Sequence, residues 1–433
     1  MRCDVPGSEG QPKMAINTPI TRKSCRSMTF QCPHWPPDWP SIKAAALAAI
    51  QSGEWGRYHS DLTKTLEKRL SSYLDSGPTR LCCSGTAALE LALRGCKISN
   101  GDEVIMAAYD FPGNFRTVEL LGAKPVLADV ATPISLNPHS SNPRDISPTI
   151  CPQQLDAAAS PNVRAVIASH LHGSHAEMKR LRQTCDQNGW TLIEDACQAI
   201  GGRINGQASG SLGHLATLSF GGSKLVSAGS GGAIIANDQR LAARLSGLLD
   251  RPGDTFPLGP LQAAVIDPQL DRLDELTQTR SLTARFLREQ VFPEMSDWEL
   301  LHSPKTDTST AVTKTENAET RVDRNPRQTG QPTYPLSTSN VPAFYKFCWL
   351  APSREIRQQI IEHGTKRGLP LGEGFRSMSR CSSKRCRKPV PTPQSDILGE
   401  RLVVMDQRAL LITPQQYPEL ADALHGLHHT VSC

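Results

Sequence analysis

The sequence lacks long apolar segments and concentrated charge. Its 433 residues contain no run of about twenty apolar residues that could span a bilayer, and residues 1–28 contain no apolar stretch of the length that a secretory signal needs. The formal net charge of +5 is dispersed, apart from the short basic run SSKRCRK at 382–388, so the chain offers no basic stripe to a nucleic acid. We therefore expect a cytoplasmic protein with no membrane and no nucleic-acid partner.

The cysteines lack the repeated short spacing of a disulfide framework or a metal site. There are 13 of them, an odd number, and several lie inside apolar runs, which is typical of reduced and mostly buried thiols. Cys381 and Cys386 come nearest to a pair of metal ligands, but no second pair follows them. We therefore expect no metal.

The composition is that of an ordinary globular protein, with 38% hydrophobic and 21% charged residues. A chain of this length can form one large domain and one smaller domain. Residues 303–340 are nearly free of large apolar side chains, so their burial cannot offset the entropy of ordering them. We predict a flexible N-terminal segment (1–35), a large domain (36–290), a disordered insertion (303–340) and a small C-terminal domain of α+β type (341–433).

Short apolar runs alternate with helical patterns through the predicted large domain. The strand candidates are TRLCCSG, DEVIMAAY, KPVLADV, VRAVIASHL, WTLIEDA, HLATLSF and GAIIAND, and the helix candidates include TAALELALRGC, HAEMKRLRQTCDQNG and the region 259–290. This alternation predicts an α/β fold whose central sheet is mostly parallel and covered by helices on both faces. Ligands of such sheets bind at the carboxyl ends of the strands, where Ser84 and Asp195 are expected to lie.

Three short stretches at this edge could each take part in binding a ligand. The sequence SGT at 84–86 stands where a strand passes into a helix, so its backbone N–H groups could hold a phosphate, although an ordinary N-cap has the same sequence. Asp195 ends a buried apolar run, where a carboxylate needs a partner such as a cationic ring nitrogen, with Gln198 three residues later. Capping of the next helix is the alternative role for Asp195.

Lys224 is the third of these features. It is the one charged residue in SFGGSKLVSAGSGG at 219–232, where serines and glycines leave room for a planar group. An amine held among small residues inside a fold is a plausible nucleophile toward an aldehyde, whereas a surface lysine is the alternative. A phosphate cradle, a carboxylate for a ring nitrogen and a reactive lysine are together the parts that pyridoxal phosphate requires.

Residues from about 50 to 275 resemble the DegT/DnrJ/EryC1/StrS family of sugar and cyclitol aminotransferases, which are pyridoxal phosphate enzymes of fold type I. The matching blocks, in the family's order, are SGTAALELAL, GDEVIMAAYDFPGNFRTVELLGAKPVLADV, VIASHLHGSHAEM, IEDACQAIGG and LSFGGSKLVSAGSGGAIIAND. Beyond residue 290 the resemblance fades.

The resemblance implies a role for each matching residue. Lys224 would bond covalently to the cofactor and then move a proton, Asp195 would hold the pyridine nitrogen, and Gln198 would lie near the ring hydroxyl. The residues implied to hold the phosphate are Gly85, Thr86 and Ser219. Phe111 would stack on the cofactor ring, with simple core packing as the alternative.

Two segments depart from the family's pattern. DTFPLGPLQAA has Thr255 and Pro257 where the family has an asparagine that reaches the phosphate across a dimer interface, which puts that contact in doubt. His172 stands in HLHG where the family usually has tyrosine. His172 lies with His170 and His175 in one cluster, which we interpret as a loop near the cofactor rather than a metal site.

The resemblance implies an aminotransferase that works as a homodimer. The amino donor would be glutamate or glutamine, and the acceptor a keto sugar, nucleotide-linked, or a keto cyclitol; HWPPDWPSIKAAALAAIQSGEWG at 34–56 faintly resembles members that act on cyclitols or aminohydroxybenzoate precursors. One alternative is a sugar dehydratase, although such relatives often replace the reactive lysine by histidine and this chain keeps Lys224. The other is a non-catalytic regulator, which the altered DTFPLGP segment and the insertion favour.

Overall fold

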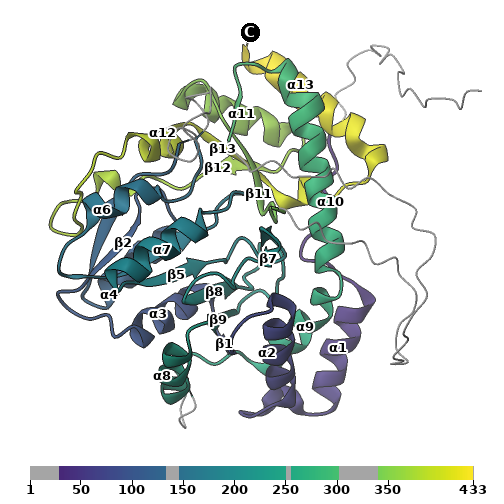
Figure 1. The fold of residues 1–433 in the computed structure, drawn as a ribbon. Helices are drawn as coiled ribbons and strands as arrows, with labels where there is room; N and C mark the ends of the chain where they lie inside the picture. Colours follow the sequence, from purple (N-terminus) through teal and green to yellow (C-terminus); the bar gives the residue numbers. More distant parts are fainter. Residues whose placement is uncertain (1–28, 133–145, 250–254, 302–339, 433) are drawn as a thin grey trace, which may run out of the picture.

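The computed structural model describes residues 29–132, 146–249, 255–301 and 340–432. Its largest element is a seven-stranded sheet in the order β1-β9-β8-β5-β4-β2-β3 (Figure 1). The strands are β1 (Thr79–Cys82), β2 (Glu103–Ala107), β3 (Lys124–Ala128), β4 (Val163–Ser169), β5 (Thr191–Asp195), β8 (Leu215–Ser219) and β9 (Gly232–Ala236). Neighbouring strands from β3 to β8 are parallel, whereas β9 is antiparallel to both β8 and β1. The expected mostly parallel sheet is therefore confirmed.

Helices cover both faces of this sheet, because the strands bury apolar side chains on both sides. One face packs against α3 (Gly85–Gly95), α4 (Pro112–Leu120) and α8 (Gln239–Leu249). The other packs against α2 (Asp61–Leu74), α6 (Leu155–Ala158), α7 (Met178–Asn188) and α9 (Pro260–Leu270). α1 (Pro40–Gln51) lies against α9 (Figure 1). The expected single helical region 259–290 is divided, because α9 ends at Leu270 and α10 spans Leu273–Phe286.

A second, antiparallel sheet forms the C-terminal part of the molecule, in the order β10-β11-β13-β12. Its strands are β10 (Glu299–Leu300), β11 (Lys346–Leu350), β12 (Leu371–Glu373) and β13 (Leu402–Asp406), and the helices beside it are α11 (Arg354–Lys366), α12 (Pro393–Arg401) and α13 (Tyr417–Ser432). Leu398 and Val404 pack into the same apolar cluster as strands β2 to β5, so the two sheets share a core.

The described residues test only parts of the predicted domain boundaries, which stay predictions. The insertion expected at 303–340 lies outside the described residues except for its last residue, and so does the segment 1–28. Phe30 is described and is buried in the core of the C-terminal part, where its backbone N–H donates to the carbonyl of Arg367 at 2.8 Å.

Candidate active site

The candidate site lies at the carboxyl ends of the parallel strands. β5 and β8 are neighbours, with Asp195 opposite Thr217 and Ser219 ending β8. α3 begins beside them because Ser84 caps it, accepting a hydrogen bond from the N–H of Ala87 at 3.0 Å. A Cβ on Gly85 would lie 2.8 Å from Ser219 Cβ, so the absence of a side chain at residue 85 lets the helix start approach β8.

Asp195 is buried, with 6% of its surface exposed, and four side-chain or backbone groups donate to it. Asn114 Nδ2 donates to Oδ2 at 2.8 Å, and the N–H of Cys197 donates to Oδ1 at 3.0 Å. The hydroxyls of Ser169 and Thr217 lie at 3.4 Å from Oδ2 and Oδ1. These donors fix the orientation of a carboxylate that points to the carboxyl edge of the sheet.

Asp110 is a second buried carboxyl at this edge, and the sequence did not identify it. Ser169 Oγ lies 2.9 Å from its Oδ2, and the N–H of Phe111 and the amide of Asn114 donate to its Oδ1 at 2.6 and 3.2 Å. Burial, together with the nearby Asp195 carboxylate, raises the pKa of Asp110 to about 8. At neutral pH, Asp110 therefore keeps a proton, which its Oδ2 can donate to Ser169.

Lys224 lies in the loop that follows β8, with its amine 4.6 Å from the centre of the Tyr345 ring. Lys346 also places its amine over this ring, at 4.7 Å, but forms an ion pair with Asp406. In the described part of the chain, no ion pair joins Lys224 to an acid. The two amines therefore differ in availability: one is held by a carboxylate and the other is not.

Cys197 interacts with groups from the three predicted parts of the site, namely the start of α3, Asp195 and Lys224. Its Sγ would lie 2.9 Å from a Cβ on Gly85, and its N–H donates to Asp195. Burial raises the pKa of its thiol; the Asp195 carboxylate also raises it, and the Lys224 ammonium lowers it. The start of α3 and Asp195 therefore both lie against Cys197, and the charge of Lys224 also acts on its thiol.

Several aromatic rings pack against one another at the edge of the candidate site. Phe111 is 41% exposed, so it is not a core residue, and its ring lies edge-on to Phe375 at 5.8 Å. Phe375 also lies 5.3 Å from the ring of His172, and its N–H donates to the Tyr109 hydroxyl at 3.1 Å. An exposed ring at the site edge, with a fixed neighbour behind it, offers a flat face to a planar ligand.

His172 is buried and neutral. Burial, together with the charges of Lys346 and Lys224, lowers its pKa to about 3. Its Nε2 lies 3.0 Å from the Tyr109 hydroxyl, and its Nδ1 is buried without a partner in the described structure. The backbone N–H of His172 donates to Gln198 Oε1 at 3.2 Å, so the amide NH2 of Gln198 is the group left to face a ligand.

The other histidines of the cluster have partners within the protein. His170 Nε2 lies 2.9 Å from the Glu194 carboxylate, and His175 Nε2 lies 3.5 Å from Ser209 Oγ. Within residues 29–132, 146–249, 255–301 and 340–432, no group of three or more His, Cys, Asp or Glu residues is arranged to hold a metal ion.

Three predicted residues have fewer contacts. Thr86 is exposed on the first turn of α3, and Ser219 is half-buried, with its Oγ 3.5 Å from the N–H of Gly221. Thr255 is exposed, and the carbonyl of the next residue, Phe256, accepts from the N–H of Cys83 at 2.9 Å, so this segment lies beside the strand that leads to Ser84. Its contact with a second subunit stays a prediction.

Comparison with known proteins identifies the family. The model of the DegT/DnrJ/EryC1/StrS aminotransferase family matches residues 40–324. The chain belongs to this family. The family and the fold expected from the sequence are thus confirmed, and membership of the family indicates pyridoxal phosphate as the cofactor.

Three curated relatives show the range of this DegT/DnrJ/EryC1/StrS family. A pleiotropic regulatory protein of Geobacillus stearothermophilus is 33% identical over 53% of this chain and 63% of its own length. An L-glutamine:2-deoxy-scyllo-inosose aminotransferase of Streptoalloteichus tenebrarius is 31% identical over 58% and 63%. A 3-amino-5-hydroxybenzoate synthase of Amycolatopsis mediterranei is 26% identical over 88% and 92%. The chain thus spans less than two thirds of the first two relatives.

The fold agrees with that of solved structures in the family. A crystal structure of 3-amino-5-hydroxybenzoic acid synthase superimposes with a TM-score of 0.75 at 21% identity, over 93% of this chain and 100% of the other. No helix in the described part of the chain is both long enough and apolar enough to cross a membrane.

The residues at the site fit pyridoxal phosphate. A helix start with its N–H groups suits the phosphate, and a Cβ on Gly222 or Gly229 would meet nothing within 4 Å, so the lysine loop leaves space for a ring. Asp195 supplies a fixed carboxylate and Lys224 an amine without an acidic partner. The donor set therefore matches the phosphate, the ring nitrogen and the aldehyde of this cofactor.

Proposed function

We propose that the protein is a pyridoxal phosphate-dependent aminotransferase. It transfers an amino group from an amino acid, glutamate or glutamine, to a keto sugar, nucleotide-linked, or a keto cyclitol; the donor becomes a 2-oxo acid and the ketone becomes an amine. The observation that carries the proposal is that the start of α3 and the buried Asp195 both lie against Cys197, whose thiol also feels the charge of Lys224. The names of the glutamine-dependent and benzoate-forming relatives support the substrate classes.

Each residue has a part that follows from its contacts. When bound, pyridoxal phosphate supplies an aldehyde and a ring that withdraws electrons from the reacting carbon. Asp195, oriented by Asn114 and Cys197, would hold a proton at the ring nitrogen. Lys224 would be the residue that bonds to the aldehyde and moves a proton at the substrate carbon. Phe111, which is 41% exposed at the edge of the site, would pack against the ring.

Binding of the cofactor phosphate needs only groups around the start of α3. The N–H groups of Gly85 and Thr86 and the hydroxyl of Ser219 are proposed to hold it, and the NH2 of Gln198 is proposed to reach the ring hydroxyl. We also propose a homodimer in the cytoplasm, which the family resemblance and the reduced cysteines support. Burial raises the pKa of the Cys185 thiol to about 12, which keeps it protonated.

The test uses the visible absorbance of the protein reconstituted with pyridoxal phosphate. We expect Lys224→Ala to abolish the absorbance of the covalently bound cofactor, whereas Lys346→Ala, which removes the other amine over Tyr345, retains it. Adding glutamate or glutamine to the wild type should convert the spectrum to that of the aminated cofactor, and a keto sugar or keto cyclitol should restore it.

Three results would contradict the proposal. Retention of the covalent spectrum in Lys224→Ala would exclude this lysine. A spectrum that no amino donor changes would favour a regulator, as the name of the Geobacillus stearothermophilus relative suggests for that protein. Loss of water from the sugar without gain of nitrogen would favour the dehydratase.

A further inference from the structure

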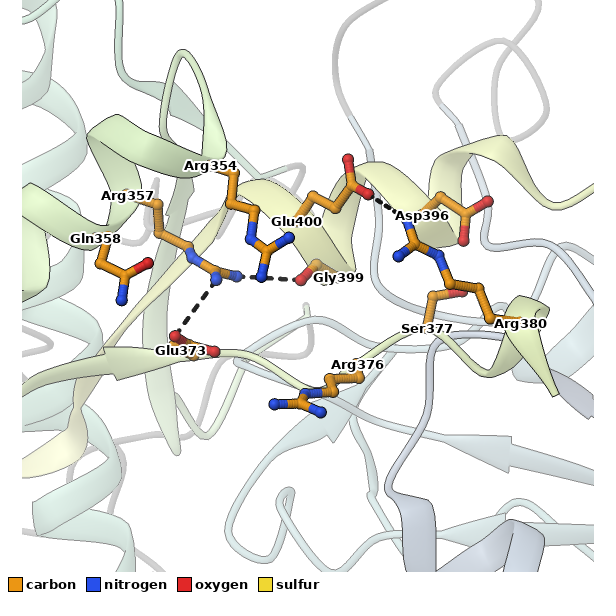
Figure 2. Close-up of a pocket in the computed structure, with 10 residues that line it drawn as sticks. All are labelled: Arg354, Arg357, Gln358, Glu373, Arg376, Ser377, Arg380, Asp396, Gly399 and Glu400. Carbon is orange, nitrogen blue, oxygen red and sulfur yellow. Dashed lines mark hydrogen bonds and ion pairs between the residues drawn. The ribbon is translucent and has the colours of Figure 1, made fainter.

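A polar cavity of about 510 Å³ lies between α11, α12 and the chain that follows β12. Figure 2 shows its lining, in which no apolar side chain takes part. The lining residues are Arg354, Arg357, Gln358, Glu373, Arg376, Ser377, Arg380, Asp396, Gly399 and Glu400. A cavity of this volume holds small organic molecules, and its lining selects a polar one.

Most of the charges around this cavity are already paired. Arg357 pairs with Glu373 at 3.3 Å and donates to the carbonyl of Gly399 at 3.0 Å. Arg380 pairs with Glu400 at 2.6 Å, and Asp396 accepts a hydrogen bond from the Ser379 hydroxyl. The acids of the lining are thus all occupied.

Three arginines of the lining keep N–H donors that have no partner in the described structure. Arg357 is 4% exposed, yet its Nε is buried with no hydrogen-bond partner in the described structure. Arg354 and Arg376 are exposed, and in the described ranges neither forms an ion pair or hydrogen bond with another residue. Figure 2 shows the guanidinium groups of Arg354 and Arg357, from α11, and that of Arg376, from the chain after β12, pointing into one hollow.

Permanently charged groups that face one another repel, and an unpaired buried N–H costs stability. An anion bound between the guanidinium groups would offset their repulsion and give the unpaired N–H an acceptor. Guanidinium groups bind phosphate and carboxylate oxygens through paired N–H donors, and several on opposite walls suit an anion with more than one charge. We propose that this cavity is a binding site for the phosphate groups of a small polar molecule.

The cavity is next to the candidate active site but separate from it. Phe375 lies against Phe111, and the adjacent Arg376 lines the cavity, so one short stretch of chain has contacts with both. Two sources of the phosphate fit this position: the acceptor substrate itself, or a free phosphate compound that acts on the site through Phe375. Binding does not depend on the proposed function, but the assignment of the source does.

Isothermal titration calorimetry with inorganic pyrophosphate tests the binding. The protein is first saturated with pyridoxal phosphate, so that the start of α3 is filled. We expect Arg354→Gln and Arg376→Gln each to weaken binding by about tenfold or more, because each removes a charged donor. Arg240→Gln, the same change at an exposed position on α8, should leave binding unchanged. Circular dichroism checks that each variant is folded.

Absence of binding to the wild type, or equal binding to Arg354→Gln and Arg376→Gln, would overturn the proposal. A second arm distinguishes the sources by assaying the amination of a nucleotide-linked keto sugar in the presence of pyrophosphate. A rise in KM at constant kcat assigns the cavity to the acceptor's phosphate, whereas a change in kcat assigns it to a free compound. Failure of this assay in a protein that still binds pyrophosphate would count against the proposed function only.

Discussion

Replacing Asp110 by asparagine tests whether this buried carboxyl is protonated in the folded protein. An asparagine has the shape of the protonated acid: its Oδ1 can accept from the N–H of Phe111, and its NH2 can donate to the Ser169 hydroxyl, whose oxygen is also an acceptor. The substitution therefore keeps the hydrogen bonds but removes the ability to ionise. Any difference in stability that grows with pH then comes from the charge.

The direction of the pKa shift of Asp110 determines how the free energy of unfolding changes with pH. The pKa of Asp110 is about 8 in the folded protein, against 3.8 as its ordinary value. The folded state thus binds the proton more tightly than the unfolded state, so the free energy of unfolding falls as pH rises from about 4 to about 8. One pH unit corresponds to about 1.4 kcal/mol, which gives an upper limit of about 3 kcal/mol between pH 5.5 and 7.5.

Urea denaturation at pH 5.5, 6.5 and 7.5, on protein freed of cofactor, measures the effect. We expect the stability of Asp110→Asn relative to the wild type to increase with pH, by at most about 3 kcal/mol between pH 5.5 and 7.5. Asp156→Asn, at an exposed position, serves as the control and should follow the wild-type curve. A constant difference between Asp110→Asn and the wild type at all three pH values would refute the protonated state.

Further predictions concern three other features. Gly85→Ala should weaken cofactor binding at least tenfold in a fluorescence titration, because its Cβ would lie 2.8 Å from Ser219 Cβ, whereas Gly222→Ala, with nothing within 4 Å, should bind as the wild type does. Glu194→Gln should lower the free energy of unfolding by about 3 kcal/mol at pH 7, because the buried carboxylate pairs with His170. Burial raises the pKa of Glu194, but its hydrogen bonds outweigh burial and hold the pKa below the usual value of a glutamate. The loss of stability in Glu194→Gln, measured by urea denaturation, should therefore shrink as pH falls below that usual value. Tyr345→Ala should lower the rate of cofactor attachment in stopped-flow absorbance more than Tyr345→Phe does, since phenylalanine keeps the ring beside Lys224; equal rates would contradict a role for the ring.

The sequence predicts the layered fold well because the strands are buried on both faces and the helices alternate with them. It does not predict strand direction, because an apolar run looks the same whichever way the strand runs. GAIIAND resembles the parallel strands in composition, yet β9 is antiparallel to β8. It also misses the end of α9, where Pro268 inside the helix is tolerated and the chain breaks only after Leu270. Direction and helix breaks depend on packing between distant segments.

The sequence predicts a residue of the candidate site where a charged side chain occurs in an apolar or small-residue context near the end of a strand. Asp195 and Lys224 meet that condition, because charge in an apolar surrounding needs a partner. Asp110 had a similar signal, an acid three residues after the buried strand β2, and could have been found by it. Tyr345 and Phe375 could not, because they come from the C-terminal part, where the resemblance to the family fades and contacts with the site span more than 100 residues.

The parallel sheet itself explains why two buried acids lie close together here. β4 lies between β2 and β5, and all three run in the same direction, so the residues at their carboxyl ends come into one row. The row reads Asp110, Ser169, Asp195, with the hydroxyl between the carboxyls at 2.9 and 3.4 Å. Two carboxylates so close in a buried place cannot both be charged at low cost, so the Asp195 carboxylate adds to the effect of burial in raising the pKa of Asp110. The register of β4 thereby places the Ser169 hydroxyl between the two carboxyl groups, where it contacts both.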